Sequence, residues 1–399
     1  MSEHPSSGAR SPEPAAHGSR KIALIGPGYP YRGGIAHFAE TMYRGLRERG
    51  YEVPFVTFKM QYPERLFPGK TQFETRPVPD PVPTVRLLNT IEPLSWRTTA
   101  HYLLDERPAA AVFMYWMPFF APAFGTIARA IRRHGIKPLA VVHNAVPHEP
   151  RPGDTTLSKY FLQACEGCVV MSEAVEQDLE RLKVSAPVRR VPHPVYTRFG
   201  APVPQAEARE RFGLKPDAPV LLFFGFIRRY KGLHVLLQSM GRVVRERPDV
   251  RLIVAGEFYE DEAPYRALIR EHRLGDHVLL QNTYIPDEEV PLYFSAADVV
   301  VQPYVSATQS GVAQIAFHFE KPLIVTDVGG LAEIVPHERA GFVVPPDDPE
   351  RLAEAILRFV REGWGPRLAE GVRERKAHYS WDRLYDAVES LVALPRPGR

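Results

Sequence analysis

The stretch that decides the fold of this chain is GFIRRYKG, at residues 225–232. It follows the apolar run Val220 to Phe224 and precedes an amphipathic run, which predicts a strand, a basic turn and a helix. Further along, the segment SATQSG at residues 306–311 lies between another apolar run and another helix-like run. Backbone N–H groups at a helix start bind phosphate oxygens, and Lys or Arg neutralises the phosphate charge. One cationic turn and one turn of small polar residues therefore indicate a nucleotide diphosphate as the ligand.

The length and composition are those of a two-domain globular protein. The chain has 399 residues, of which 44% are apolar and 24% are charged. Its two cysteines, Cys165 and Cys168, are too few for a disulfide framework. A Cys-x-x-Cys pair can be half of a zinc site or a redox pair. Because there is no second cysteine pair, we expect both side chains simply to pack in the interior.

Two segments bear on the relation of the chain to membranes. Residues 1–19 have no apolar core, so we expect a disordered tail and not a signal peptide. The uncharged run at residues 109–128 has the length of a membrane span, but it contains Pro118 and Pro122. A buried strand followed by a loop and a helix explains this run better than a transmembrane helix.

The formal net charge of +3 is unevenly distributed. Residues 1–200 hold 25 Lys and Arg against 18 Asp and Glu, whereas residues 201–399 hold 25 against 29. A basic N-terminal half is suited to an anionic acceptor or to the anionic surface of a membrane. A solvated, arginine-rich surface without a partner is an equally simple interpretation.

Strand and helix patterns alternate along the chain, which is typical of parallel sheets covered by helices on both faces. We predict an N-terminal Rossmann-like domain at residues 20–195, a linker at 196–217, a C-terminal Rossmann-like domain at 218–378, and a helix and tail at 379–399. The Pro-rich residues 61–95 are expected to form a long irregular loop. Ligands bind at the carboxyl ends of parallel strands, so a cleft between two doubly wound domains is the expected site.

Five segments of the C-terminal half carry a family resemblance: FFGFIRRYKG, YIPDEEVPLYFSAADVVVQPY, KPLIVTDVGGLAEIV, GFVVPPDDPERLAEAI and YSWDRLYDAV. They resemble the retaining glycosyltransferases of family four, also described as glycosyl transferases group 1, which have the α/β GT-B fold. The N-terminal segment GYPYRGGIAHFAETMYRGLRERGYEV is similar to the family's first glycine-rich turn and helix. The resemblance spans most of residues 20–390 and implies that the last helix returns to the N-terminal domain.

The resemblance also implies an activity. A sugar would be transferred from a nucleotide-sugar donor, UDP- or GDP-linked, to a glycan or lipid-linked acceptor with retention of the anomeric configuration. The donor would bind mainly to the C-terminal domain and the acceptor to the N-terminal one. A phosphate oxygen of the donor is thought to take the acceptor proton, so neither a protein base nor a metal nor another cofactor is expected, and the sequence has no Asp-x-Asp motif. Nucleic acid is not an expected partner, and the expected location is cytoplasmic, with peripheral contact to the inner face of the membrane.

Three residues are expected to take part in catalysis. Lys231 matches the family's lysine that contacts the donor diphosphate, where a fixed cation favours departure of the leaving group. Phe226 occupies the position of the family's usual arginine, so Arg228 is the favoured substitute. His143 follows the predicted strand Leu139 to Val142, near where the family often has a histidine beside the transferring sugar. An exposed turn lysine and a structural histidine are the simpler alternatives.

The donor-binding candidates come from three regions of the chain. Glu257, Tyr284 and Ile285 follow predicted strands, in the region that surrounds the nucleoside base by resemblance. Most family members carry two glutamates near residues 306–315, but this chain has no acid between Ser306 and Phe319. It offers neutral candidates there instead: Thr308, Gln309, Ser310, Gly311, Val312 and Gln314.

Gly33 and Gly34 are the third group of candidates, because glycine at a helix start lets the backbone approach a phosphate closely. A simple tight turn would also explain them. The nearby Gly26-x-Gly28 does not complete a dinucleotide fingerprint, since Tyr31 stands at the third glycine position. That disfavours a dehydrogenase.

Two other functions stay open at this point. A nucleotide-sugar epimerase or hydrolase would need an acid/base pair in the cleft, which the acid-poor segment at residues 306–319 disfavours. A non-catalytic GT-B protein, binding the donor or a partner subunit, would explain the missing glutamates. The retained Lys231 and its basic turn favour an active enzyme over this alternative.

Overall fold

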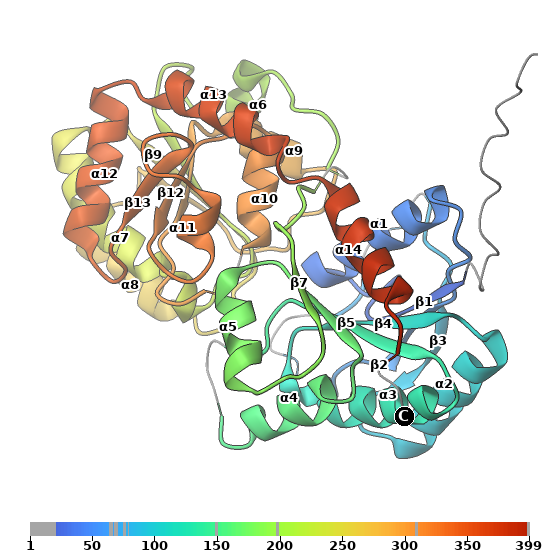
Figure 1. Ribbon diagram of the computed structural model, residues 1–399. Helices are drawn as coiled ribbons and strands as arrows, with labels where there is room; N and C mark the ends of the chain where they lie inside the picture. Colours follow the sequence, from blue (N-terminus) through green and yellow to red (C-terminus); the bar gives the residue numbers. More distant parts are fainter. Residues whose placement is uncertain are drawn as a thin grey trace, which may run out of the picture.

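The computed structural model describes residues 21–63, 67, 71–74, 77–78, 80–147, 151–196, 199–307 and 310–396. Two parallel sheets, each covered by helices, form two lobes (Figure 1). The first sheet has seven strands in the order β3-β2-β1-β4-β5-β6-β7, and the second has six in the order β10-β9-β8-β11-β12-β13. The reversal of strand order beside β1 and beside β8 makes both sheets doubly wound, as expected. The tail at residues 1–19 lies outside the described residues.

The N-terminal sheet has buried central strands. Every residue of β1, β4 and β6 is buried, which explains why they are short apolar runs without alternation. The strands are β1 Ile22–Ile25, β2 Phe55–Met60, β3 Val85–Asn89, β4 Ala110–Tyr115, β5 Lys137–Val142, β6 Gly167–Val170 and β7 Val188–Arg190. The helices are α1 Gly34–Glu48, α2 Pro93–Glu106, η2 Pro118–Phe120, α3 Ala121–Arg133, α4 Asp154–Leu162 and α5 Glu173–Arg181.

The C-terminal sheet repeats this plan after the short helix α6 at Gln205–Arg211. Its strands are β8 Val220–Phe224, β9 Arg251–Ala255, β10 Val278–Gln281, β11 Val299–Gln302, β12 Leu323–Thr326 and β13 Gly341–Val344. Its helices are η3 Arg229–Lys231, α7 Leu233–Glu246, α8 Ala263–Glu271, α9 Val290–Ala296, α10 Gly311–His318, α11 Leu331–Ile334, α12 Pro349–Arg361 and α13 Gly365–Lys376.

The expectation of a long irregular loop at residues 61–95 is wrong in its second half. β3 pairs in parallel with β2 at the sheet edge, and α2 begins at Pro93. An edge strand buries little, and only Leu88 of β3 is fully buried, so β3 lacks the apolar run that marks the central strands. Proline at a first helical position starts a helix instead of breaking it.

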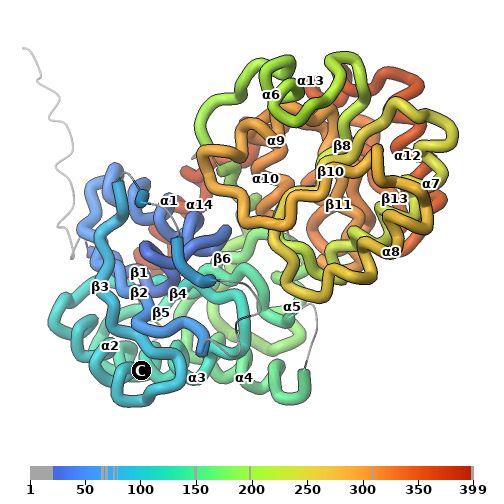
Figure 2. The backbone as a smooth tube through the Cα atoms, turned by 180° about the vertical axis from the view of Figure 1, so that it is seen from behind, coloured from blue at the N-terminus to red at the C-terminus, as the bar shows by residue number. Residues whose placement is uncertain are grey.

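The last helix, α14 at Trp381–Ala393, returns to the N-terminal lobe as expected. It lies beside α1 in both views (Figures 1 and 2), and Arg49 after α1 donates hydrogen bonds to Asp382 and Asp386 at 2.8 and 2.7 Å. At the crossing between the lobes, the Trp381 Nε1–H donates to the Val195 carbonyl at 2.9 Å. The chain therefore connects the two lobes twice, once near Val195 and once just before α14.

The uncharged run at residues 109–128 forms β4, η2 and the first half of α3, in agreement with the expected buried strand, loop and helix. None of the helices that the structure describes has both the length and the apolar character needed to cross a bilayer. Cys165 and Cys168 are both buried and reduced.

Candidate functional site

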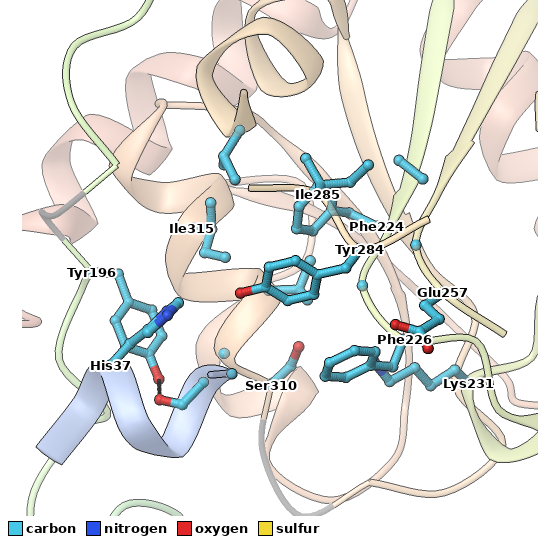
Figure 3. Close-up of a pocket in the computed structure, with 18 of the residues that line it drawn as sticks. His37, Tyr196, Phe224, Phe226, Lys231, Glu257, Tyr284, Ile285, Ser310 and Ile315 are labelled. Atoms are coloured by element: carbon cyan, nitrogen blue, oxygen red, sulfur yellow. Dashed lines mark hydrogen bonds between the residues drawn. The ribbon is translucent and has the colours of Figure 1, made fainter. Parts of the chain in front are cut away.

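A cavity of about 270 Å³ lies between the two lobes (Figure 3). It is built where β8 and β9 end and where α1 and α10 begin, which is the edge at which parallel sheets bind ligands. Its wall includes nine of the residues that the sequence suggests: Gly33, Gly34, Lys231, Glu257, Tyr284, Ile285, Ser310, Gly311 and Val312. Residues that are far apart in the chain therefore meet in one place.

Lys231 is the cation of the C-terminal wall. It ends the short helix η3, and the following Gly232 has a left-handed backbone with φ of 71°. A Cβ at Gly232 would lie 1.8 Å from the carbonyl oxygen of Pro303, so the turn packs directly on the end of β11. Burial, together with the nearby charge of Arg228, lowers the pKa of Lys231 to about 7. An anion bound in the cavity would raise this pKa again and hold the ammonium group charged.

Arg228 is close to Lys231 but does not line the cavity. Its guanidinium lies 5.2 Å from the ring centroid of Tyr259. Phe226, at the position of the family's usual arginine, lines the cavity and packs on Tyr259 with a ring-centroid distance of 4.3 Å. The sequence therefore identified the right turn, whereas the predicted role of Arg228 beside the donor stays a prediction.

The second turn presents the start of α10 to the cavity. The Ser310 hydroxyl accepts hydrogen bonds from the Ala313 N–H at 3.3 Å and from the Gln302 amide at 2.9 Å, so it caps the helix. Gly311 and Ile315 on the same helix line the cavity, whereas Gln314 is buried away from it. Thr308 and Gln309 lie outside the described residues. The start of α10 therefore offers backbone N–H groups and no acidic side chain.

The start of α1 forms the opposite wall. Gly33 has φ of 104°, a conformation that favours glycine, and Gly34 follows as the first helical residue. The Tyr196 hydroxyl donates to the Gly34 carbonyl at 3.4 Å. One turn further along, His37 Nε2 lies 3.8 Å from carboxylate oxygens of both Glu74 and Asp287. Figure 3 shows His37 and Tyr196 across the cavity from Lys231.

The structure adds a residue that the sequence did not suggest. Arg32, just before Gly33, donates a hydrogen bond from Nη2 to Glu257 Oε2 at 2.8 Å, and its guanidinium lies 4.1 Å from the ring centroid of Tyr284. The side chains of Arg32 and Glu257 are only 5% and 1% exposed. No local pattern reveals this ion pair, because its two residues belong to different lobes.

His143 lies at the end of β5, but it does not line the cavity. Its imidazole is buried, and its ring centroid lies 4.7 Å from that of Phe38, edge to face. Burial, with a smaller effect of the neighbouring His193, lowers the pKa of His143 to about 3, so the ring is neutral at physiological pH. A catalytic role for His143 stays a prediction.

A metal site was not expected from the sequence. Within the described parts of the chain, no group of three or more His, Cys, Asp or Glu residues has an arrangement suited to a metal ion. The charged groups in the cavity wall are instead Lys231, the Arg32-bound Glu257, and Asp287 beside His37.

Two family models match the chain in succession. Residues 32–199 match "Glycosyltransferase Family 4", and residues 218–362 match "Glycosyl transferases group 1". Together these matches cover about three quarters of the chain, and they meet where the chain first crosses between the lobes. The chain belongs to the family of glycosyltransferases with family 4 and group 1 domains, and its fold is GT-B.

Curated relatives carry glycosyltransferase names. "Putative glycosyltransferase YtcC" of Bacillus subtilis is 30% identical over 51% of this chain and 50% of its own length. "D-inositol 3-phosphate glycosyltransferase" of Saccharomonospora viridis is 32% identical over 64% of this chain and 62% of its own length. A protein of that same name from Xylanimonas cellulosilytica is 26% identical over 98% of this chain and all of its own. The chain spans about half the length of the first three relatives that it matches.

Solved structures share the fold along nearly the whole chain. A sucrose-phosphate synthase from Thermosynechococcus elongatus is 24% identical, with a TM-score of 0.72 over 93% of this chain and 98% of its own. HepE from Anabaena, solved in complex with UDP-glucose, is 15% identical, with a TM-score of 0.74 over 94% of this chain and 100% of its own. At these identities the likeness establishes the fold and leaves the substrate open.

Proposed function

We propose that this protein transfers a sugar from a nucleotide-sugar donor, UDP- or GDP-linked, to a glycan or lipid-linked acceptor with retention of the anomeric configuration. The observation that carries the proposal is the position of Lys231, a half-buried cation in the wall of a cavity between two Rossmann-like lobes. Removing a lysine ammonium from water is costly unless an anion pairs with it, and a diphosphate is the anion that helix starts of this kind bind.

In the proposal, both lobes contribute groups that face the donor diphosphate. Lys231 and the N–H groups at the start of α10 face the proposed diphosphate from one lobe, and Gly33 and Gly34 face it from the other. As the phosphate bond to the sugar breaks, negative charge grows on the leaving group, and a fixed cation stabilises that charge most strongly where water is excluded. A phosphate oxygen of the donor would take the acceptor proton, so the proposal requires neither a protein base nor a metal.

The donor most worth testing first is UDP-glucose. HepE, which shares the fold, was solved in complex with it. In our proposal Tyr284 and Ile285, both in the cavity wall, contact the nucleoside. Ile315 also lines the cavity and offers no polar group, so ribose recognition would depend on the other wall residues or on backbone groups.

The acceptor would bind to the N-terminal lobe. The basic half of the chain would place this lobe on an anionic membrane at its inner face, where lipid-linked acceptors are found. Binding to vesicles that contain anionic lipid should then fall steeply as salt increases. Absent or salt-independent binding would remove the membrane from the proposal without affecting the donor site.

A thermal-shift screen of nucleoside diphosphates and nucleotide sugars tests the donor site. A ligand at about 100 times its dissociation constant adds about 2.7 kcal/mol of stability. We expect stabilisation by one base series, its loss in Lys231→Ala, and its retention in Lys321→Ala. Lys321 is a matched control because burial also lowers its pKa while it lies outside the cavity wall.

Turnover then distinguishes an enzyme from a binding protein. Release of the nucleoside diphosphate should require an acceptor, and the glycosidic bond of the product should keep the donor's anomeric configuration by NMR. Nucleotide binding without turnover on any glycan or lipid-linked acceptor would favour the non-catalytic alternative.

A further inference from the structure

The ion pair of Arg32 and Glu257 joins the two lobes beside the cavity, whose wall includes Glu257. Arg32 lies in the turn between β1 and α1, and Glu257 follows β9. Their side chains are nearly inaccessible, at 5% and 1% exposure, and Nη2 lies 2.8 Å from Oε2. We call this ion pair the cross-domain pair. A deeply buried ion pair contributes little net stability, since the desolvation of its two charges cancels much of their attraction.

Arg32 is held by the C-terminal lobe on two sides. Glu257 accepts its hydrogen bond, and the ring of Tyr284 lies under its guanidinium at 4.1 Å. Its Nε is buried and has no hydrogen-bond partner among the described residues. Because Gly33 and Gly34 directly follow Arg32 and line the cavity, docking of Arg32 also fixes the start of α1 against the other lobe.

Glu257 poses an electrostatic problem for an anionic ligand. Its carboxylate stands in the same wall as Lys231, where the donor diphosphate is proposed to bind. A carboxylate without a cation would repel the diphosphate or would pair with Lys231 and remove that lysine from the donor. Arg32 prevents both, and it does so only while the two lobes are together.

We propose that Arg32 is a donor-positioning residue, which neutralises Glu257 and docks the start of α1 so that the donor diphosphate binds only between closed lobes. This inference rests on the proposed function, since it concerns the same site. It assigns to Arg32 an effect on donor affinity that acts through Glu257 and does not require contact with the donor.

A second contact between the start of α1 and the C-terminal lobe also involves a carboxylate of that lobe. His37 of α1 lies 3.8 Å from Asp287 of the C-terminal lobe. In both contacts a basic side chain of the N-terminal lobe meets a carboxylate of the C-terminal lobe. Both contacts join the start of α1 to the C-terminal lobe, although His37 lies equally close to Glu74 of its own lobe.

A double-mutant cycle on the cross-domain pair tests the proposal. UDP and UDP-glucose would be titrated calorimetrically into wild type, Arg32→Gln, Glu257→Gln and the double variant. Arg32→Gln alone leaves a buried carboxylate beside the diphosphate, so we expect affinity to fall about thirtyfold. Adding Glu257→Gln to Arg32→Gln removes that carboxylate, so the double variant should bind UDP more tightly than Arg32→Gln does and within about threefold of Glu257→Gln alone.

Two further variants separate positioning from general structure. Arg32→Lys keeps the charge and should retain most of the affinity. Arg49→Gln is the control: Arg49 pairs with Asp382, Asp386 and Glu389 of α14 within the N-terminal lobe, at the end of α1 that lies away from the cavity. Its affinity for UDP should stay that of wild type, and thermal unfolding of every variant checks that it is folded.

Two results would overturn the proposal. If the double variant binds as weakly as Arg32→Gln, then Arg32 contacts the donor directly and charge compensation is wrong. If none of the variants changes affinity, then the cross-domain pair is structural only.

A ligand-free measurement keeps the inference separate from the proposed function. The radius of gyration from small-angle X-ray scattering should increase in Arg32→Gln, because the contact that docks the start of α1 on the C-terminal lobe is lost and water reaches the Glu257 carboxylate. If wild type binds no nucleotide, the proposed function fails. Unchanged scattering in Arg32→Gln would then overturn the docking role as well.

Discussion

Gly232 and Gly256 on the C-terminal side of the cavity and Gly34 on the N-terminal side are glycines for different reasons. On the C-terminal side, an added Cβ would lie 1.8 Å from the Pro303 carbonyl oxygen at Gly232 and 2.0 Å from the Gly225 carbonyl oxygen at Gly256. On the N-terminal side, the atom nearest to an added Cβ at Gly34 is the Tyr196 hydroxyl oxygen, at an ordinary 3.9 Å. Gly34 also has no positive φ that would demand glycine.

The difference separates a scaffold from a binding surface. Gly232 and Gly256 let backbone segments of the C-terminal lobe touch, so they hold Lys231 and Glu257 in place. The fold does not require Gly34, so its missing side chain leaves space for something else, which we propose is the donor phosphate. Substitutions on the two sides should therefore act on different quantities.

Gly232→Ala should have the largest effect, and the effect should be on stability. The new methyl group clashes with backbone and the residue must keep a left-handed conformation, so we expect a loss of about 4 kcal/mol or more. Urea unfolding measures it. Gly275→Ala is the matched control, because an added Cβ there meets nothing within 4 Å. If Gly232→Ala and Gly275→Ala are equally stable, the turn at Gly232 relaxes, and the fold does not require glycine there.

Lys231→Ala should leave stability intact and lower turnover. Removing a half-buried lysine costs the fold little, whereas the departing diphosphate loses its fixed cation. We expect kcat to fall by about 10² to 10³. Steady-state kinetics with UDP-glucose measure the change, and the Lys321→Ala variant should be near wild type. A higher KM for UDP-glucose with an unchanged kcat would show that Lys231 contributes only to binding of the ground state.

Gly34→Ala should sharpen the comparison from the other side. Its unfolding free energy should stay within about 0.5 kcal/mol of wild type, because alanine fits the first turn of α1. Nucleotide affinity should fall about tenfold, since the methyl group occupies the proposed phosphate space. Calorimetric titration of UDP measures it. If Gly34→Ala lowers stability but leaves nucleotide affinity unchanged, then Gly34 is needed only for a tight turn.

The pH dependence of donor binding should show the smallest effect. Burial and the nearby Arg228 lower the pKa of Lys231 to about 7, and a bound diphosphate would raise it. Binding therefore takes up a proton above pH 7, and affinity is full below this pH and lost as the pH rises. From pH 7 to pH 8, affinity for UDP-glucose should fall about fivefold in wild type. A similar slope in Lys231→Ala would assign the proton to another group.

Much of the fold was readable from the sequence. β8 has the bounds that its apolar run predicts, and α7 follows it as the amphipathic run predicts, because buried parallel strands and amphipathic helices carry strong periodic signals. β3 was missed because an edge strand buries little, and α2 because Pro93 looked like part of a loop. Short elements such as α4 have no long periodic face to reveal them.

For the site, the sequence could predict only residues that a single turn or loop identifies. Lys231 was predicted from its basic turn and Gly33 from its place at a helix start, and both residues line the cavity. His143 was expected in the cleft because it ends a strand, but Phe38 covers its ring. The partner of Arg32 lies in the other lobe, so only the folded chain could show the cross-domain pair.

The most direct test of the central claim is a crystal structure of the protein with the nucleoside diphosphate that stabilises it most. We predict phosphate oxygens at about 3 Å from Lys231 Nζ and from the backbone nitrogens at the start of α10, with Gly34 facing the phosphates. A nucleotide bound outside the cavity between the lobes, or inside it with the phosphates away from Lys231, would contradict the assignment of this cavity as the donor site.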